Sequence, residues 1–167
     1  FTTVFVDLLT AVGIGMVVAC VIFMKRASDL TEGNYKSMAA THASSPFRKA
    51  DDIPTEFKEK IFIENFDGPI FFGNVTGFNS AMQHIPEEAQ IVILRMRYVS
   101  FMDQSGVYAL ETAVTELKER GVLVLMTLGQ QQPHEILQKM KVIPNVIPAD
   151  NVFETTHEAV DYLRTKM

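Results

Sequence analysis

The stretch IVILRMRYVSFMDQSGVYALETAVTELKERGVLVLMTL, residues 91–128, reads as a buried strand, a helix and a second buried strand. Its runs 91–96 and 122–128 are apolar apart from Arg95 and Thr127 and are of strand length, which is typical of a parallel sheet that is covered by helices. Between them lies a pattern of helical period that stops at Gly121, a residue typical of a helix C-terminus. The stretch therefore predicts a strand–helix–strand unit of an α/β fold.

The helix of this unit starts at a polar interruption made of Asp103, Gln104, Ser105 and Gly106. Three explanations compete: a helix cap, a phosphorylation switch and a corner that binds an anion. A carboxylate or hydroxyl just ahead of a helix bonds its free N–H groups, and Gly106 allows close packing. These four residues form the candidate site, and all three explanations stay open at this point.

Outward from this unit, similar signals predict further elements. Residues 60–66 and 69–72 carry the strand pattern on either side of Asp67 and Gly68, which predicts a β-hairpin. The remaining elements are helices near 75–85 and 133–141, a strand at 145–147, and a last helix that opens on a capping box of Thr155 and Glu158. The predicted order is ββαβαβαβα: an α/β fold with a mixed, mostly parallel sheet, an N-terminal hairpin and flanking helices.

Residues 4–24 are almost entirely apolar, with Asp7 as their one charge. As a helix they would extend about 32 Å, which matches a hydrocarbon core of about 30 Å. The short apolar stretch and basic leading end of a signal peptide are absent. Lys25 and Arg26 follow, and the positive-inside rule places the chain after them in the cytoplasm. The sequence therefore predicts one transmembrane helix.

A stripe of Asp7, Ala11, Gly15 and Ala19 recurs every fourth residue of this span. Small side chains on one helix face let a second helix approach, although glycine and alanine are also simply common in membrane helices. A carboxylate aligned with that face favours contact with partner helices. The chain begins with Phe rather than Met, so we expect it to be part of a longer membrane protein.

Composition shifts divide the chain into three parts: a transmembrane helix at 1–26, a linker at 27–55 and a cytosolic domain at 56–167. The linker contains residues that favour irregular chain, namely Ser28, Gly33, Asn34, Ser44, Ser45, Pro46, Asp51, Asp52 and Pro54. It is predicted to be irregular apart from a short helical turn near 35–40.

Charge and composition argue against several functions. With 15 basic and 20 acidic residues the net charge is -5, and no basic cluster exists to bind nucleic acid. Cys20 is a single cysteine, and the four histidines lie far apart without ligand spacing, so neither a disulfide nor a metal site is predicted. No nucleophile with a base and no phosphate-binding glycine loop is evident. We therefore expect a non-enzyme that needs no cofactor.

Three motifs together resemble one family. They are GPIFFGNVTGF at 68–78, the MDQSG helix start at 102–106, and FVDLLTAVGIGMVVACVIFMKR at 5–26. The first two resemble the STAS domain, and the third resembles the last membrane helix of the SulP anion transporters that carry such a domain. Together with the predicted order of elements, which also resembles that of the STAS domain, these matches span nearly the whole chain.

The resemblance implies a C-terminal regulatory and assembly STAS domain of a carrier for sulfate, bicarbonate or chloride. Its partners would be the rest of the membrane domain, the lipid bilayer, a second copy in a homodimer and a regulatory protein. It would lie at the inner or plasma membrane with the STAS domain in the cytoplasm. The translocation site would lie in helices outside this chain.

The resemblance also extends to Ser105, because anti-sigma factor antagonists of this fold are phosphorylated at that position. Gln104 breaks the usual pair of hydroxyl residues. The alternative function is a membrane-tethered signalling module switched at Ser105.

For Phe71, Phe72 and Gly73, the pattern favours core packing and a turn. The alternative is an interdomain contact, which exposure of a phenylalanine would support.

Overall fold

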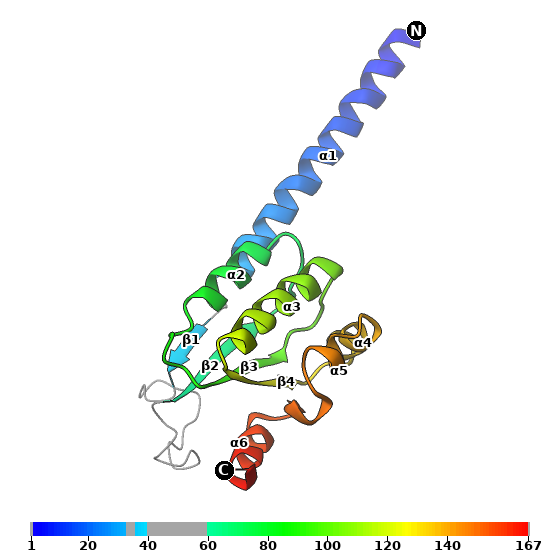
Figure 1. Cartoon of the computed structure of the whole chain (residues 1–167). Helices are drawn as coiled ribbons and strands as arrows, with labels where there is room; N and C mark the ends of the chain where they lie inside the picture. Colours follow the sequence, from blue (N-terminus) through cyan, green and yellow to red (C-terminus); the bar gives the residue numbers. More distant parts are fainter. Residues whose placement is uncertain (1, 33–35, 40–59, 167) are drawn as a thin grey trace.

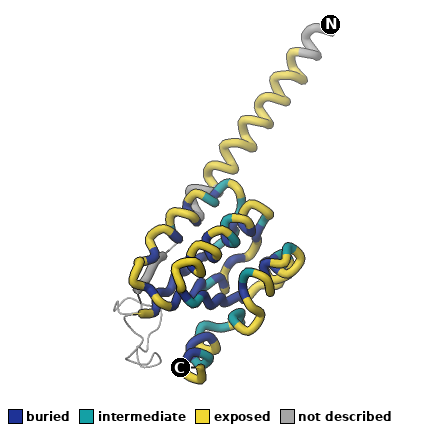
Figure 2. The backbone as a smooth tube through the Cα atoms, in the orientation of Figure 1, coloured by how far each residue is buried: buried dark blue, intermediate teal, exposed yellow. Residues whose placement is uncertain are grey.

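An apolar helix leads into a layered α/β domain (Figure 1). The computed structural model describes residues 2–32, 36–39 and 60–166. Helix α1 (Thr2–Glu32) contains the predicted membrane span, and its segment Asp7–Arg26 is long and apolar enough to cross a bilayer, with a mean hydropathy of 2.3. Every residue of this segment is exposed (Figure 2).

Within the described residues, five strands form one sheet in the order β1-β2-β3-β4-β5. They are β1 (Lys36–Ala39), β2 (Ile61–Asp67), β3 (Ile91–Tyr98), β4 (Leu123–Leu128) and β5 (Val152–Phe153). β1 runs antiparallel to β2, whereas β2, β3, β4 and β5 are parallel. The mixed, mostly parallel sheet is confirmed.

The prediction of a second hairpin strand at residues 69–72 is wrong. Residues 69–72 form no strand in this described segment, and Ile70 makes only an isolated parallel bridge with Met102. The chain turns at Gly68, which has a φ of 88°. The N–H of Ile70 then donates to the Phe101 carbonyl at 2.8 Å. The chain after β2 therefore joins the loop after β3 and does not fold back on β2.

The antiparallel partner of β2 comes from the predicted linker. Lys36 of β1 lies opposite Asn65 of β2, so the helical turn predicted near 35–40 is also wrong. A four-residue strand has too few positions to show a period, and its partner is distant in sequence. Residues 27–32 of the predicted linker continue helix α1, so the irregular chain predicted there is wrong. Its residues 33–35 and 40–55 lie outside the described residues.

The predicted strand at 145–147 is wrong as well. Short helix α5 (Val142–Asn145) lies there, and 3-10 helix η1 (Ala149–Asn151) leads into β5, which pairs with the end of β4. Ile147 is buried in the core, so its apolar character reflects packing rather than a strand.

The other helices lie where the sequence predicts them. They are α2 (Val75–Gln83), α3 (Gln104–Glu119), α4 (Gln131–Lys139) and α6 (Thr156–Lys166). Gly121, with a φ of 79°, follows the end of α3. At the start of α6, the Glu158 N–H donates to Thr155 Oγ1 at 3.3 Å and that hydroxyl donates to Glu158 Oε1 at 2.9 Å. The predicted capping box is confirmed.

Helices cover both faces of the sheet. α2, α3, α4 and α5 contribute to a core around Phe66 and Phe78, whereas α6 covers the other face with Ala159 and Leu163. Figure 2 shows burial concentrated in the strands and the inner sides of the helices. The carboxyl ends of the parallel strands meet at one edge of the sheet, where loops of open α/β sheets commonly carry binding sites.

Candidate functional site

Asp103 ties the start of α3 to the loop after β2. It is the N-cap residue of α3, and its Oδ1 accepts a hydrogen bond from the Gly106 N–H at 2.8 Å. Its Oδ2 accepts from the Phe72 N–H at 3.0 Å. The capping explanation therefore holds for Asp103. The bond to Phe72 joins two candidate sites that lie far apart in sequence.

Two loops run side by side at this corner. The Asp103 N–H donates to the Ile70 carbonyl at 3.1 Å, next to the bond from the Ile70 N–H to Phe101. Gln132 of α4 fixes the second loop, because its side chain accepts from the Met102 N–H and donates to the Met102 carbonyl, both at 2.9 Å. Backbone bonds therefore set the position of the Asp103 carboxylate.

Gly106 packs directly against the first of these loops. A Cβ atom added to it would lie 2.7 Å from the Ile70 carbonyl oxygen and 2.9 Å from Ile70 Cγ2. Both distances are shorter than van der Waals contact, so α3 can approach the loop this closely only with glycine at this position.

Ser105 and Gln104 face solvent in the first turn of α3. The Gln104 amide donates to the Tyr108 hydroxyl at 3.1 Å. The Ser105 hydroxyl makes no hydrogen bond within the described residues, and Asp103 supplies the cap in its place. Because the Asp103 carboxylate already occupies the start of α3, its charge opposes an anion bound at this corner.

The two phenylalanines of the FFG turn have different environments. Phe71 is half-buried and lies edge-on to the Phe72 ring, with centroids 5.9 Å apart. Phe72 is 60% exposed, so the prediction of core packing is wrong for this residue. Gly73 leaves space for the Phe71 ring, since an added Cβ would lie 2.6 Å from Phe71 Cε2. The exposure of Phe72 favours the interdomain alternative.

The helix stripe of Asp7, Ala11, Gly15 and Ala19 lies on α1 and is fully open. A Cβ atom added to Gly15 would meet nothing within 4 Å. The structure therefore leaves this face available to another helix, and the packing role stays a prediction.

Replacement of Asp103 by alanine should lower the free energy of unfolding by about 2 kcal/mol, because an N-cap bond contributes about 1 kcal/mol and the bond to Phe72 about as much again. Urea unfolding of the full chain in nanodiscs, followed by far-UV circular dichroism, would measure it. Glu119→Ala is the matched control, because Glu119 is an exposed carboxylate near the other end of α3. Equal stability of the two variants would contradict the prediction.

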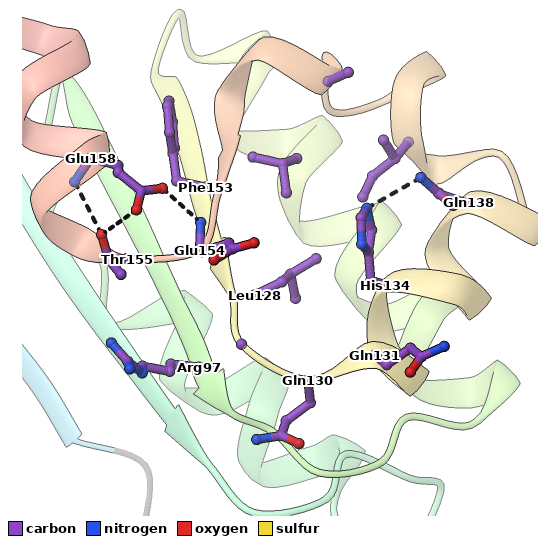
Figure 3. Close-up of a pocket in the computed structure, with 14 residues that line it drawn as sticks. Arg97, Leu128, Gln130, Gln131, His134, Gln138, Phe153, Glu154, Thr155 and Glu158 are labelled. Carbon is purple, nitrogen blue, oxygen red and sulfur yellow. Dashed lines mark hydrogen bonds between the residues drawn. The ribbon is translucent and has the colours of Figure 1, made fainter.

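A cavity of about 810 Å³, not expected from the sequence, lies between the starts of α4 and α6 (Figure 3). It opens at the carboxyl ends of β4 and β5, and its polar lining includes Arg97, His134, Glu154 and Glu158. The relevant sequence signal is position: Arg97 lies at the carboxyl end of β3, Glu154 follows β5, and His134 and Glu158 lie in the first turns of α4 and α6. No group of three metal-ligating side chains occurs in the part of the chain that the structure describes.

Glu158 is held in its charged form at this cavity. The hydrogen bond from the Thr155 hydroxyl, then the bond from the Glu154 N–H, lower the pKa of the Glu158 carboxyl, and the nearby Arg97 charge acts in the same direction. The Glu154 N–H reaches Glu158 Oε2 at 3.1 Å. This carboxylate is therefore a fixed negative charge at the start of α6.

Comparison with known proteins gives consistent matches. The sequence model of a domain family described as "STAS domain" matches residues 52–159. The putative sulfate transporter YvdB of Bacillus subtilis is 28% identical over 138 residues, which cover 82% of this chain and 24% of the relative. The bicarbonate transporter BicA of Synechocystis sp. is 28% identical over 167 residues, covering 95% of this chain and 28% of the relative.

A solved structure is similar over the domain. The SulP transporter STAS domain from Vibrio cholerae superposes with a TM-score of 0.52 at 28% identity, over 64% of this chain and 83% of that one. The chain spans about a quarter of the length of the curated relatives it matches, at 24% and 28%.

Proposed function

Because the chain belongs to the STAS domain family, whose match covers residues 52–159, we propose that it is the C-terminal regulatory and assembly region of a SulP-type anion transporter together with that transporter's last membrane helix. Sulfate, bicarbonate or chloride is the substrate class, and the sulfate and bicarbonate transporters among its relatives support it. The observation that carries the proposal is an exposed apolar helix leading directly into a STAS fold.

The exposed surface of α1 supports a membrane location. Leu9 is 79% exposed and Phe23 73% exposed, and no side chain of Asp7–Arg26 is buried. A continuous apolar surface of this kind is costly in water and stable in hydrocarbon. Lys25 and Arg26 at its end favour a cytoplasmic domain by the positive-inside rule. We assign the helix to the inner or plasma membrane on this basis.

The sheet topology places the carboxyl ends of the parallel strands near the end of α1. β1 begins opposite Asn65, near the carboxyl end of β2. Because a chain covers at most about 3.6 Å per residue, the end of α1 at Glu32 lies within about 14 Å of Lys36. The carboxyl-end edge of the parallel strands, with the Asp103 corner, is therefore the edge nearest the membrane helix, as Figure 1 also shows.

Exposed aromatic side chains gather at that edge. Each of these side chains is between 47% and 60% exposed. Phe72 follows β2, Tyr98 ends β3, Phe101 follows β3, and Tyr108 is the fifth residue of α3. We name this set the aromatic face. Backbone hydrogen bonds from the Gly68 N–H to the Tyr98 carbonyl and from the Ile70 N–H to the Phe101 carbonyl join the loops after β2 and β3. The backbone that carries these rings is therefore held in one position. Aromatic residues of this kind are enriched in interface cores, and we assign the face to contact with the transporter's membrane domain.

Ion-uptake measurements on the full-length parent would test the proposal. In proteoliposomes, deletion of residues 56–167 should change the uptake rate of sulfate or bicarbonate, or the fraction of dimer. Phe72→Ser with Phe101→Ser should change uptake while the domain stays folded. Glu88→Ser with Gln90→Ser, exposed residues near the opposite edge of the sheet, is the matched control. Unchanged uptake and assembly after the deletion would remove the regulatory proposal.

A second candidate function is the membrane-tethered signalling module switched at Ser105. The exposure of the Ser105 hydroxyl supports it, because a kinase could reach that group. A phosphate on Ser105 would add negative charge beside the Asp103 carboxylate, so it would weaken the cap and disturb the neighbouring aromatic face. Phosphate-sensitive mass spectrometry on protein from native cells would detect the modification. Absence of phosphate, with Ser105→Asp and Ser105→Ala variants behaving alike, would eliminate the switch.

A further inference from the structure

We propose that the cavity between the starts of α4 and α6 binds a small zwitterion, a molecule that carries both a carboxylate and an ammonium group, such as a free amino acid. This inference does not depend on the proposed transporter function. The cavity, at about 810 Å³, lies within the size range of small-molecule sites. Its lining combines apolar side chains, including Leu128, Ile143 and Phe153, with polar ones, and Figure 3 labels Leu128 and Phe153 among them.

Arg97 supplies the positive charge of this site. It follows the buried part of β3, and Gly129 lets it lie close to the end of β4, since a Cβ on Gly129 would come within 2.7 Å of Arg97 Cγ and 2.9 Å of the Arg97 carbonyl oxygen. In the described structure its exposed guanidinium makes no hydrogen bond or ion pair. A planar guanidinium without a hydrogen-bond partner in the described structure suits a carboxylate group.

Glu154 and Glu158 supply negative charge on the same side of the cavity. Glu158 is charged and fixed by its bonds at the start of α6. The exposed Glu154 side chain makes no hydrogen bond among the described residues, so it is available to an ammonium group. Neither carboxylate forms an ion pair with Arg97 across the described chain. The opposite charges thus face one cavity without contact, and a molecule bearing both charges can bridge them.

The lining discriminates against other ligand classes. One arginine stands against two carboxylates, so an inorganic anion or polyphosphate meets net repulsion. A simple cation can pair with a carboxylate but leaves Arg97 without a partner, whereas a zwitterion pairs with both kinds of charge. On the α4 wall, the amides of Gln130, Gln131 and Gln138 offer both donors and acceptors. The apolar lining residues suit a side chain or hydrocarbon stem. This combination matches an amino-acid-like molecule.

Isothermal titration of the full chain in nanodiscs would test the site. L-glutamine and L-leucine are the zwitterionic probes, and acetate, inorganic phosphate and ethylamine carry one kind of charge each. We expect saturable binding of at least one zwitterion and much weaker binding of the other three probes. No zwitterion binding, or binding of acetate, phosphate or ethylamine as strong as that of the tighter-binding zwitterion, would overturn the proposal.

Two variants locate the binding. Arg97→Gln and Glu154→Gln should each weaken zwitterion binding by about tenfold or more, the effect of losing one charge-assisted contact. Lys139→Gln and Glu119→Gln are matched controls, because both residues are exposed charges outside the cavity. Circular dichroism must show equal folding for all four. If the cavity variants and the control variants bound the zwitterion with equal affinity, the binding would lie outside the cavity. That result would overturn the proposed site.

Discussion

Replacement of Phe78 by alanine should lower the free energy of unfolding of the domain by about 3–5 kcal/mol. Phe78 is fully buried, at 0% exposure, on the inner side of α2. Its ring lies 4.7 Å, centroid to centroid, from the Phe66 ring of β2, so the substitution removes the contact that joins the first helix of the domain to the sheet. Because domains are stable by only about 5–15 kcal/mol, this loss is a large fraction of the total.

Urea unfolding of the full chain in nanodiscs, followed by circular dichroism of the domain, would measure this effect. Phe72→Ala is the matched control, because the same side chain is removed from an exposed position six residues earlier. We expect it to change stability by less than about 0.5 kcal/mol. Similar losses for the two variants would show that the assigned burial of Phe78 or exposure of Phe72 is wrong.

Gly106→Ala should destabilise the domain by about 1–3 kcal/mol, the cost of overpacking a tight contact. The new methyl group would meet the Ile70 carbonyl oxygen at 2.7 Å. Ile70 cannot retreat freely, because its N–H bonds Phe101 and its carbonyl accepts from Asp103. Either α3 or the loop after β2 must move, and the bonds of the Asp103 carboxylate to Gly106 and Phe72 lengthen with it.

Hydrogen exchange at the N–H groups of Phe72 and Gly106 would report this movement directly, since both donate to Asp103. Exchange at both should accelerate in Gly106→Ala. Ser105→Ala, at the exposed neighbouring position, is the control and should leave both rates unchanged. A Gly106→Ala protein with native stability and native exchange rates would refute the close packing of α3.

The aromatic face, the Asp103 corner and the cavity share the carboxyl-end edge of one sheet. This edge is also where β1 begins, and β1 follows α1 in the chain. A ligand in the cavity or a phosphate on Ser105 would therefore act at the edge that we assign to contact with the membrane domain. The Asp103 corner couples the loops of β2 and β3, so a change at one loop reaches the other through short backbone bonds.

Local patterns in the sequence determined much of this protein. The apolar span of α1, the buried runs of β3 and β4, and the start of α3 at Gln104 each follow from the chemistry of consecutive residues. The capping box of Thr155 and Glu158 is equally local. Such features depend on hydrophobic period and on N–H groups within one turn, and both are visible in a short window.

Only the tertiary structure decided which distant segments pair. It placed β1 beside β2 where the sequence predicted a hairpin with 69–72, and it put the last strand at Val152–Phe153. It exposed Phe72, bonded its N–H to Asp103, and set Arg97 against Glu158 in one cavity. These outcomes depend on the free energy of packing many remote side chains and strand edges together, which no local pattern encodes.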